Sequence, residues 1–143
     1  MKEKTGILIQ ARLSSSRLPG KMLMEIDQVP LVEYVYLRCL NASSSHLVAV
    51  ITSDDPSDDE LYGFCCEKAI PVFRGPLENV LNRYIRAADF FDLTHIVRVC
   101  GDSPFVDTRA MDAMVCLPRE QELDYASMEN PLDGFLSELI SRP

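Results

Sequence analysis

The chain has 143 residues, which is enough for one domain with one sizeable hydrophobic core. Its formal net charge of -8 argues against a general nucleic-acid or membrane-surface binder, because such proteins carry an excess of basic residues. No apolar run approaches the roughly 20 residues that cross a bilayer, and residues 1–4 lead into no signal-peptide pattern, so we expect a cytoplasmic protein without membrane association.

The chain begins with an apolar run at residues 6–9 that predicts a buried strand, followed by a loop over residues 10–23 that reads Q-A-R-L-S-S-S-R-L-P-G-K-M-L. Arg12, Arg17 and Lys21 punctuate this loop, which contains no carboxylate. Guanidinium groups bind phosphate oxygens bidentately, and a lysine adds a compact positive charge. The loop therefore predicts a triphosphate-binding site, with a solvated basic loop as the alternative.

The rest of the chain alternates strands with helices about four times, which predicts an α/β three-layer sandwich with a mainly parallel sheet. We see no linker and expect a single domain over residues 1–143. We expect strands at residues 6–9, 46–52, 70–73, 94–100, 124–128 and 135–140, helices at 30–41, 57–68, 77–91 and from 107 or 108 to about 115, and a turn at 131–134 between the last two strands.

Three local signals refine these elements. Ser57 followed by Glu60 predicts a capping box, so we interpret the acidic run of residues 57–60 as a helix start rather than a metal site. Asp107 or Thr108 is expected to cap the last helix. Pro71 places the strand at residues 70–73 near a sheet edge, because proline cannot donate to a ladder.

The candidate site residues follow predicted strands. Ligands of parallel α/β sheets bind at the carboxyl ends of the strands, so the basic loop, Ser53–Asp54 and Gly101–Asp102 can share one rim. Asp102 is the candidate Mg²⁺ ligand, since a carboxylate at a strand end can hold a cation that bridges phosphates. An aspartate that merely closes its own turn is the alternative.

The five cysteines, Cys39, Cys65, Cys66, Cys100 and Cys116, contain no C-x-x-C pair. Each lies in an apolar or helical context, so we expect reduced and largely buried thiols, typical of a reducing compartment. A metal site or a redox pair is the alternative that this spacing favours less.

The basic loop resembles the signature loop of the sugar-activating cytidylyltransferases of the spore-coat-polysaccharide type, which are related to the CMP-KDO and acylneuraminate cytidylyltransferases. Segments at residues 52–54, 71–75, 80–84 and 101–104 match in the family's order and with similar gaps. The resemblance covers residues 6 to about 107 and implies a nucleotide-diphospho-sugar transferase-like fold, which is a Rossmann variant.

This resemblance implies that the protein transfers CMP from CTP to a sugar or sugar acid for surface or spore-coat polysaccharide biosynthesis, releasing pyrophosphate, with Mg²⁺ as cofactor and a possible homodimer. Arg12, Arg17 and Lys21 would hold the triphosphate, and Asp102 the metal. Arg74 would contact the cytosine carbonyl, whereas Arg83 ranks below it because it could be a solvated partner of nearby acids. The implied nucleotide-binding residues are Ala11, Ser53, Asp54, Arg74, Gly75, Asn79 and Arg83.

Domains of this family usually run some tens of residues further, so we expect the domain to lack its C-terminal part, which bears on turnover more than on nucleotide binding. Two alternatives remain. A non-catalytic nucleotide-binding or interaction domain would bind CTP without releasing pyrophosphate, and a nucleotidyltransferase that uses another NTP would show a different nucleotide-dependent thermal shift.

Overall fold

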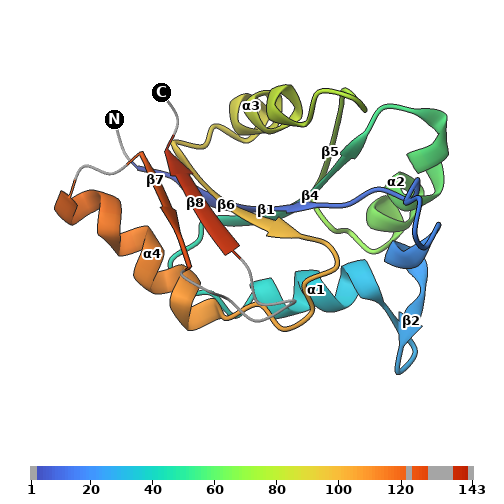
Figure 1. Ribbon diagram of the computed structural model, residues 1–143, viewed down its shortest axis with the longest axis horizontal. Helices are drawn as coiled ribbons and strands as arrows, with labels where there is room; N and C mark the ends of the chain where they lie inside the picture. Colours follow the sequence, from blue (N-terminus) through green and yellow to red (C-terminus); the bar gives the residue numbers. More distant parts are fainter. Residues whose placement is uncertain (1–2, 122–123, 129–136, 142–143) are drawn as a thin grey trace.

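The computed structural model describes residues 3–121, 124–128 and 137–141, which build a six-stranded sheet with helices on both faces (Figure 1). The strands of this sheet are β1 (Thr5–Gln10), β4 (Leu47–Ser53), β5 (Val72–Gly75), β6 (His95–Cys100), β7 (Tyr125–Ser127) and β8 (Ser137–Ser141). A separate hairpin pairs β2 (Glu25–Ile26) with β3 (Val29–Pro30). The helices are α1 (Leu31–Cys39), α2 (Asp59–Glu67), α3 (Val80–Phe91) and α4 (Thr108–Gln121), with 3₁₀ turns at Lys21–Leu23 and Pro56–Asp58.

The strand order is β5-β4-β1-β6-β8-β7. β1 lies inside the sheet and pairs in parallel with β4 and β6, and β5 pairs in parallel with β4. β8 is antiparallel to both β6 and β7. The predicted α/β architecture with a mainly parallel sheet is therefore confirmed, and so is the edge position of the strand that follows Pro71.

Two hydrophobic cores lie on opposite faces of the sheet. Side chains alternate along β1, so Ile7 and Ile9 join one core while Leu8 joins the other. Because both faces are covered, the strand is apolar at successive positions, which is why it reads as a continuous hydrophobic run. Side chains of α1, α2 and α4 pack into the first core. Side chains of α3, which lies alone above the sheet in Figure 1, pack into the second.

The helix starts follow the predictions in part. Asp107 caps α4, because its Oδ1 accepts hydrogen bonds from the backbone amides of residues 109 and 110 at 2.9 and 3.3 Å. The predicted capping box of Ser57 and Glu60 is wrong. A 3₁₀ turn comes first, Asp55 accepts from the Ser57 amide at 2.9 Å, and α2 begins only at Asp59.

The helix predicted at residues 77–91 begins at Val80. The apolar side chains along one face of this helix are not all buried. Tyr84 and Ala88 face the sheet, whereas Leu81 and Ile85 are 71% and 48% exposed. Leu81 and Ile85 line an apolar groove of about 660 Å³ between α3 and the β6–β8 part of the sheet. A single helix is too narrow to cover this whole face, which leaves some of these apolar side chains exposed.

The last two predicted strands are confirmed over residues 125–127 and 137–141, while the turn predicted at residues 131–134 lies outside the described residues. Among the described residues, no helix is both long and apolar enough to span a membrane.

All five cysteines lie in the described part of the chain and each is a free thiol, but the prediction that all are buried is wrong, because Cys66 and Cys116 are exposed. We expect these two to react first with a thiol reagent on the native protein. Burial raises the pKa of Cys39 and Cys65 to about 12, so their reactive thiolates are scarce at neutral pH. A timed colorimetric titration should give two fast thiols, a slower Cys100 and all five after denaturation. Fast labelling of all five in the native protein would contradict this burial.

Candidate functional site

The basic loop and the ends of β1 and β6 enclose a pocket of about 210 Å³. It lies at the carboxyl ends of two parallel strands, where ligands of such sheets bind. Most of its lining is polar or charged, as expected for a site that binds a small anion. The lining residues are Gln10, Arg12, Ser15, Ser16, Arg17, Lys21, Met22, Cys100 and Asp102.

The loop holds its shape through the backbone of Leu13. The Leu13 carbonyl accepts hydrogen bonds from the Ser15 amide at 2.8 Å and from the Gly20 amide at 2.9 Å, which closes the loop on itself. Gly20 has φ 74°, a left-handed conformation that strains residues with a Cβ, so glycine is favoured at this turn. The loop is therefore built to present its side chains from a fixed backbone.

Asp58 anchors this loop to β4, a role that the sequence analysis did not find. Its carboxylate is fully buried and accepts a hydrogen bond from the Leu13 amide at 2.7 Å. The other carboxylate oxygen accepts from the Ser53 amide at 3.2 Å and from the Ser53 hydroxyl. One side chain thus joins the basic loop, the exit of β4 and the start of α2.

The three predicted cationic residues all line the pocket, and they differ in their partners. Arg12 and Arg17 are exposed and form no ion pair within the described residues. Lys21 pairs with Asp102, whose side chain is 44% exposed. The prediction that Lys21 has no nearby acid is therefore wrong, because the fold brings residue 102 to the loop. The pocket keeps a net positive charge from the two arginines.

The turn after β6 packs tightly against the loop. A Cβ at Gly101 would lie 2.8 Å from the Met22 sulfur and 3.1 Å from the Ala11 Cβ, so only glycine fits here without displacement. Ala11 itself is buried beneath the pocket rather than lining it. This packing places Asp102 at the pocket, beside Lys21.

The predicted base-binding arginine, Arg74, is engaged by the protein itself. Its Nε donates to the Ser53 carbonyl at 2.8 Å, and its Nη2 donates to the Asp55 carbonyl at 3.0 Å and to the Asp59 carboxylate at 2.7 Å. The guanidinium also lies 5.1 Å from the centroid of the Tyr62 ring. Arg74 therefore braces the exit of β4, where the Asp54 amide donates to the Gly75 carbonyl.

Arg83 is fully buried, so the alternative that it is a solvated partner of nearby acids is wrong. It donates to the Pro76 carbonyl at 3.1 and 2.7 Å and to the Leu77 carbonyl at 2.8 Å, and it thereby holds the segment between β5 and α3. Burial lowers the pKa of Arg83, partly offset by Asp58. A Cβ at Gly75 would lie 3.0 Å from the Arg83 Cγ, so this glycine makes room for the arginine.

Of the other predicted nucleotide-binding residues, Asn79 caps α3 by accepting from the Asn82 amide at 2.9 Å, and Asp54 is exposed beside the buried Ser53. None of these residues lines the pocket. The predicted site therefore separates into a cationic pocket and a second group that braces the neighbouring loops. Gln10 and Cys100, which the sequence analysis did not select, line the pocket because their strands end there.

Comparisons with known proteins identify relatives of this chain. The family model described as Cytidylyltransferase matches residues 6–137. The chain is 32% identical over 138 residues to the spore coat polysaccharide biosynthesis protein SpsF of Bacillus subtilis (strain 168), covering 94% of this chain and 58% of that protein.

Two solved structures are similar. A cytidylyltransferase from Leptospira borgpetersenii serovar Hardjo-bovis (strain JB197) superposes with a TM-score of 0.89 at 28% identity, over 98% of this chain and 61% of that chain. A CMP:2-keto-3-deoxy-manno-octonic acid synthetase complexed with CTP superposes with a TM-score of 0.73 at 25% identity, over 89% and 54%. The chain thus spans little more than half the length of these relatives. The sheet, the loop and the match over residues 6–137 together show that the chain belongs to the cytidylyltransferase family, with its nucleotide-sugar transferase-like fold.

Proposed function

We propose that the protein binds CTP and transfers CMP to a sugar or sugar acid, with pyrophosphate as the leaving group. The observation that carries this proposal is the pocket itself, which is lined by Arg12, Arg17 and Lys21 together with Asp102. A pocket of about 210 Å³ is of the right order for phosphate groups, while the nucleoside would extend beyond it. The solved relative complexed with CTP supports the choice of nucleotide.

The chemistry asked of the protein is mainly positioning and charge stabilisation. A hydroxyl or carboxylate oxygen of the acceptor forms a bond to the α-phosphorus as the bond to the bridging oxygen of pyrophosphate breaks. Negative charge then accumulates on the leaving pyrophosphate. Arg12 and Arg17 can donate hydrogen bonds to it, because neither forms an ion pair among the described residues. Lys21 adds a third cation on the same wall.

The donor set at Asp102 fits a magnesium ion held jointly with phosphates. One carboxylate oxygen pairs with Lys21 and the other has no side-chain partner among the described residues. No group of three metal-binding side chains is found in the described part of the chain, and Mg²⁺ commonly takes one or two carboxylates with phosphates and water. When bound there, the ion would neutralise phosphate charge and orient the α-phosphate. We propose Asp102 as the ligand supplied by this chain.

We propose an origin for base selection other than the contact between Arg74 and cytosine that the resemblance implies. The Nε and Nη2 of Arg74 already donate to carbonyl and carboxylate oxygens, so these two nitrogens could reach cytosine only by giving up those partners, which leaves Nη1. We propose that Arg74 instead fixes the backbone at the exit of β4. Exposed backbone and side-chain groups near Asp54 are then available to the base.

Calorimetric titration with CTP and UTP in the presence of Mg²⁺ tests this proposal, together with a pyrophosphate-release assay on a panel of acceptor sugars. We expect CTP to bind roughly ten- to a hundredfold more tightly than UTP, because the two bases differ in a donor or acceptor at the 4-position and a mismatch costs about 1–3 kcal/mol. Equal affinities would point to a nucleotidyltransferase with another NTP preference. CTP binding without turnover on any acceptor would favour the non-catalytic alternative.

A further inference from the structure

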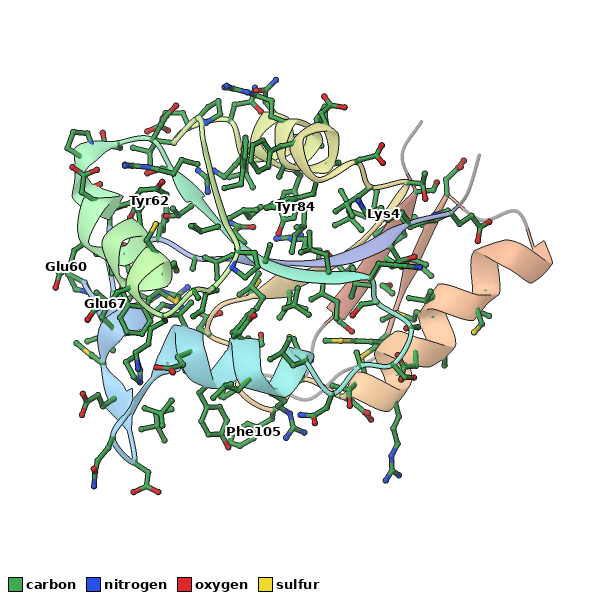
Figure 2. All side chains as sticks on the ribbon, turned by 180° about the vertical axis from the view of Figure 1, so that it is seen from behind. Lys4, Glu60, Tyr62, Glu67, Tyr84 and Phe105 are labelled. Atoms are coloured by element: carbon green, nitrogen blue, oxygen red, sulfur yellow. The ribbon has the colours of Figure 1, made fainter. Side chains whose placement is uncertain are left out.

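Gln10 is the uncharged hydrogen-bonding side chain at the end of β1, and it lines the pocket. Its carboxamide oxygen accepts a hydrogen bond from the hydroxyl of Tyr84 at 3.3 Å. Tyr84 belongs to α3 and lies between that helix and the sheet, as Figure 2 shows from behind. Tyr84, buried in the core beneath α3, therefore touches a side chain of the candidate phosphate pocket.

Arg98 completes the set behind Tyr84. It lies on β6 two residues before Cys100, so both side chains leave the strand on the same face of the sheet. Its guanidinium lies near the Tyr84 hydroxyl, where burial raises the pKa of the phenol and the positive charge of Arg98 lowers it by a smaller amount. Its Nη1 is held at 2.9 Å by the Oε2 of Glu138 on β8, which fixes where the guanidinium lies.

The chemistry of these groups fixes the direction of each hydrogen bond. A guanidinium carries a positive charge and can only donate, so Arg98 near the Tyr84 oxygen favours the orientation in which the phenol proton points away from it. Burial raises the pKa of Tyr84, so this proton is retained across the physiological range. The proton then points to an acceptor on Gln10, which is the carboxamide oxygen. The NH₂ group of Gln10 is left as the end that can face a ligand.

We propose that Tyr84 and Arg98 are positioning residues that lock Gln10 as a hydrogen-bond donor to a phosphate oxygen of the bound nucleotide. A glutamine amide that rotates freely would present its oxygen as often as its nitrogen, and the oxygen repels a phosphate. The hydrogen bond from Tyr84 to the Gln10 oxygen disfavours that alternative, and the charge of Arg98 polarises the Tyr84 hydroxyl. The inference rests on the proposed function, because it takes a nucleotide triphosphate as the ligand.

A double-mutant cycle with Tyr84→Phe and Gln10→Ala tests this inference by calorimetric titration with CTP and Mg²⁺. We expect Tyr84→Phe to weaken CTP binding about two- to tenfold, which is the size of one hydrogen bond, and Gln10→Ala to weaken it to a similar degree. In the Gln10→Ala background the Tyr84→Phe change should have no further effect on affinity, since the group that it orients is absent. A purely structural role of Tyr84 would persist in that background.

Two further variants sharpen the test. Gln10→Glu keeps the shape but replaces the donor with a carboxylate, so CTP binding should fall more than in Gln10→Ala. Tyr36→Phe removes a hydroxyl from α1 on the opposite side of the sheet and should leave affinity unchanged. If wild type binds CTP but neither Tyr84→Phe nor Gln10→Ala changes the affinity, the inference is wrong and the proposed function stands. If wild type binds no nucleotide, the proposed function fails and the inference with it.

Discussion

Asp58→Asn should lower the free energy of unfolding by about 2–4 kcal/mol. The Asp58 carboxylate is fully buried and accepts three hydrogen bonds, from the Leu13 amide and from both the amide and the hydroxyl of Ser53. An amide of the same shape has one oxygen, so its NH₂ group must face a buried donor, and at least one donor loses its partner. Urea denaturation followed by circular dichroism measures the change.

Asp59→Asn is the matched control for this substitution. Asp59 is the next residue in the chain and also an acid, but its side chain is 63% exposed and its partner Arg74 keeps two backbone acceptors. We expect a change of no more than about 1 kcal/mol, as for other exposed ion pairs. Because Asp58 fixes the basic loop, Asp58→Asn should also weaken CTP binding. Equal stability losses in the two variants would show that burial of Asp58 does not matter.

Lys21→Ala should weaken CTP binding roughly ten- to a hundredfold while changing the free energy of unfolding by no more than about 1 kcal/mol. A charge-assisted hydrogen bond to phosphate is lost, whereas the partly exposed pair with Asp102 contributes little to stability. CMP binding should change less, since Lys21 is assigned to the outer phosphates. Calorimetric titration with both nucleotides and a thermal melt of the free protein measure these effects.

Lys68→Ala provides the matched control. Lys68 forms a comparable exposed ion pair with Glu33 at 3.2 Å, but it does not line the pocket. Its removal should reproduce the small stability change and leave CTP affinity intact. A Lys21→Ala variant that folds and binds CTP like wild type would show that the basic loop is only a solvated surface. Arg12→Ala is expected to behave like Lys21→Ala without the loss of an ion pair.

The sequence predicted the pocket wall well because its signals are local. An apolar run gives β1, and the basic residues of the loop follow it within one continuous segment, so Arg12, Arg17 and Lys21 could be placed together. The position of Asp102 at a neighbouring strand end followed from the rule for parallel sheets. The pairing of Lys21 with Asp102 did not follow, because it joins residues 81 positions apart and depends on side-chain reach.

The structural roles of Asp58, Arg74 and Arg83 were harder to recognise for a related reason. Asp58 looks like part of an acidic helix start, and its burial appears only when the basic loop folds over it. Arg83 lies on a helix where charged residues usually face solvent, yet its long side chain reaches back to carbonyls before the helix. Arg74 matched a family segment, but a match specifies a residue type and leaves its partners undetermined. In each case the partners of a polar group depend on how its side chain is directed in the folded protein, which the residue type alone does not specify.

The sheet order also determines when the structure can assemble. β7 precedes β8 in the chain, yet it pairs only with β8, which lies between it and β6. During synthesis on the ribosome β7 is therefore made before β8, the strand with which it pairs. β1 is made first of all and can pair only after β4 and β6 have followed. Such contacts between distant segments slow folding because a long loop must close before any pairing is gained. We therefore expect β7 and β8 to join the sheet after β1, β4, β5 and β6.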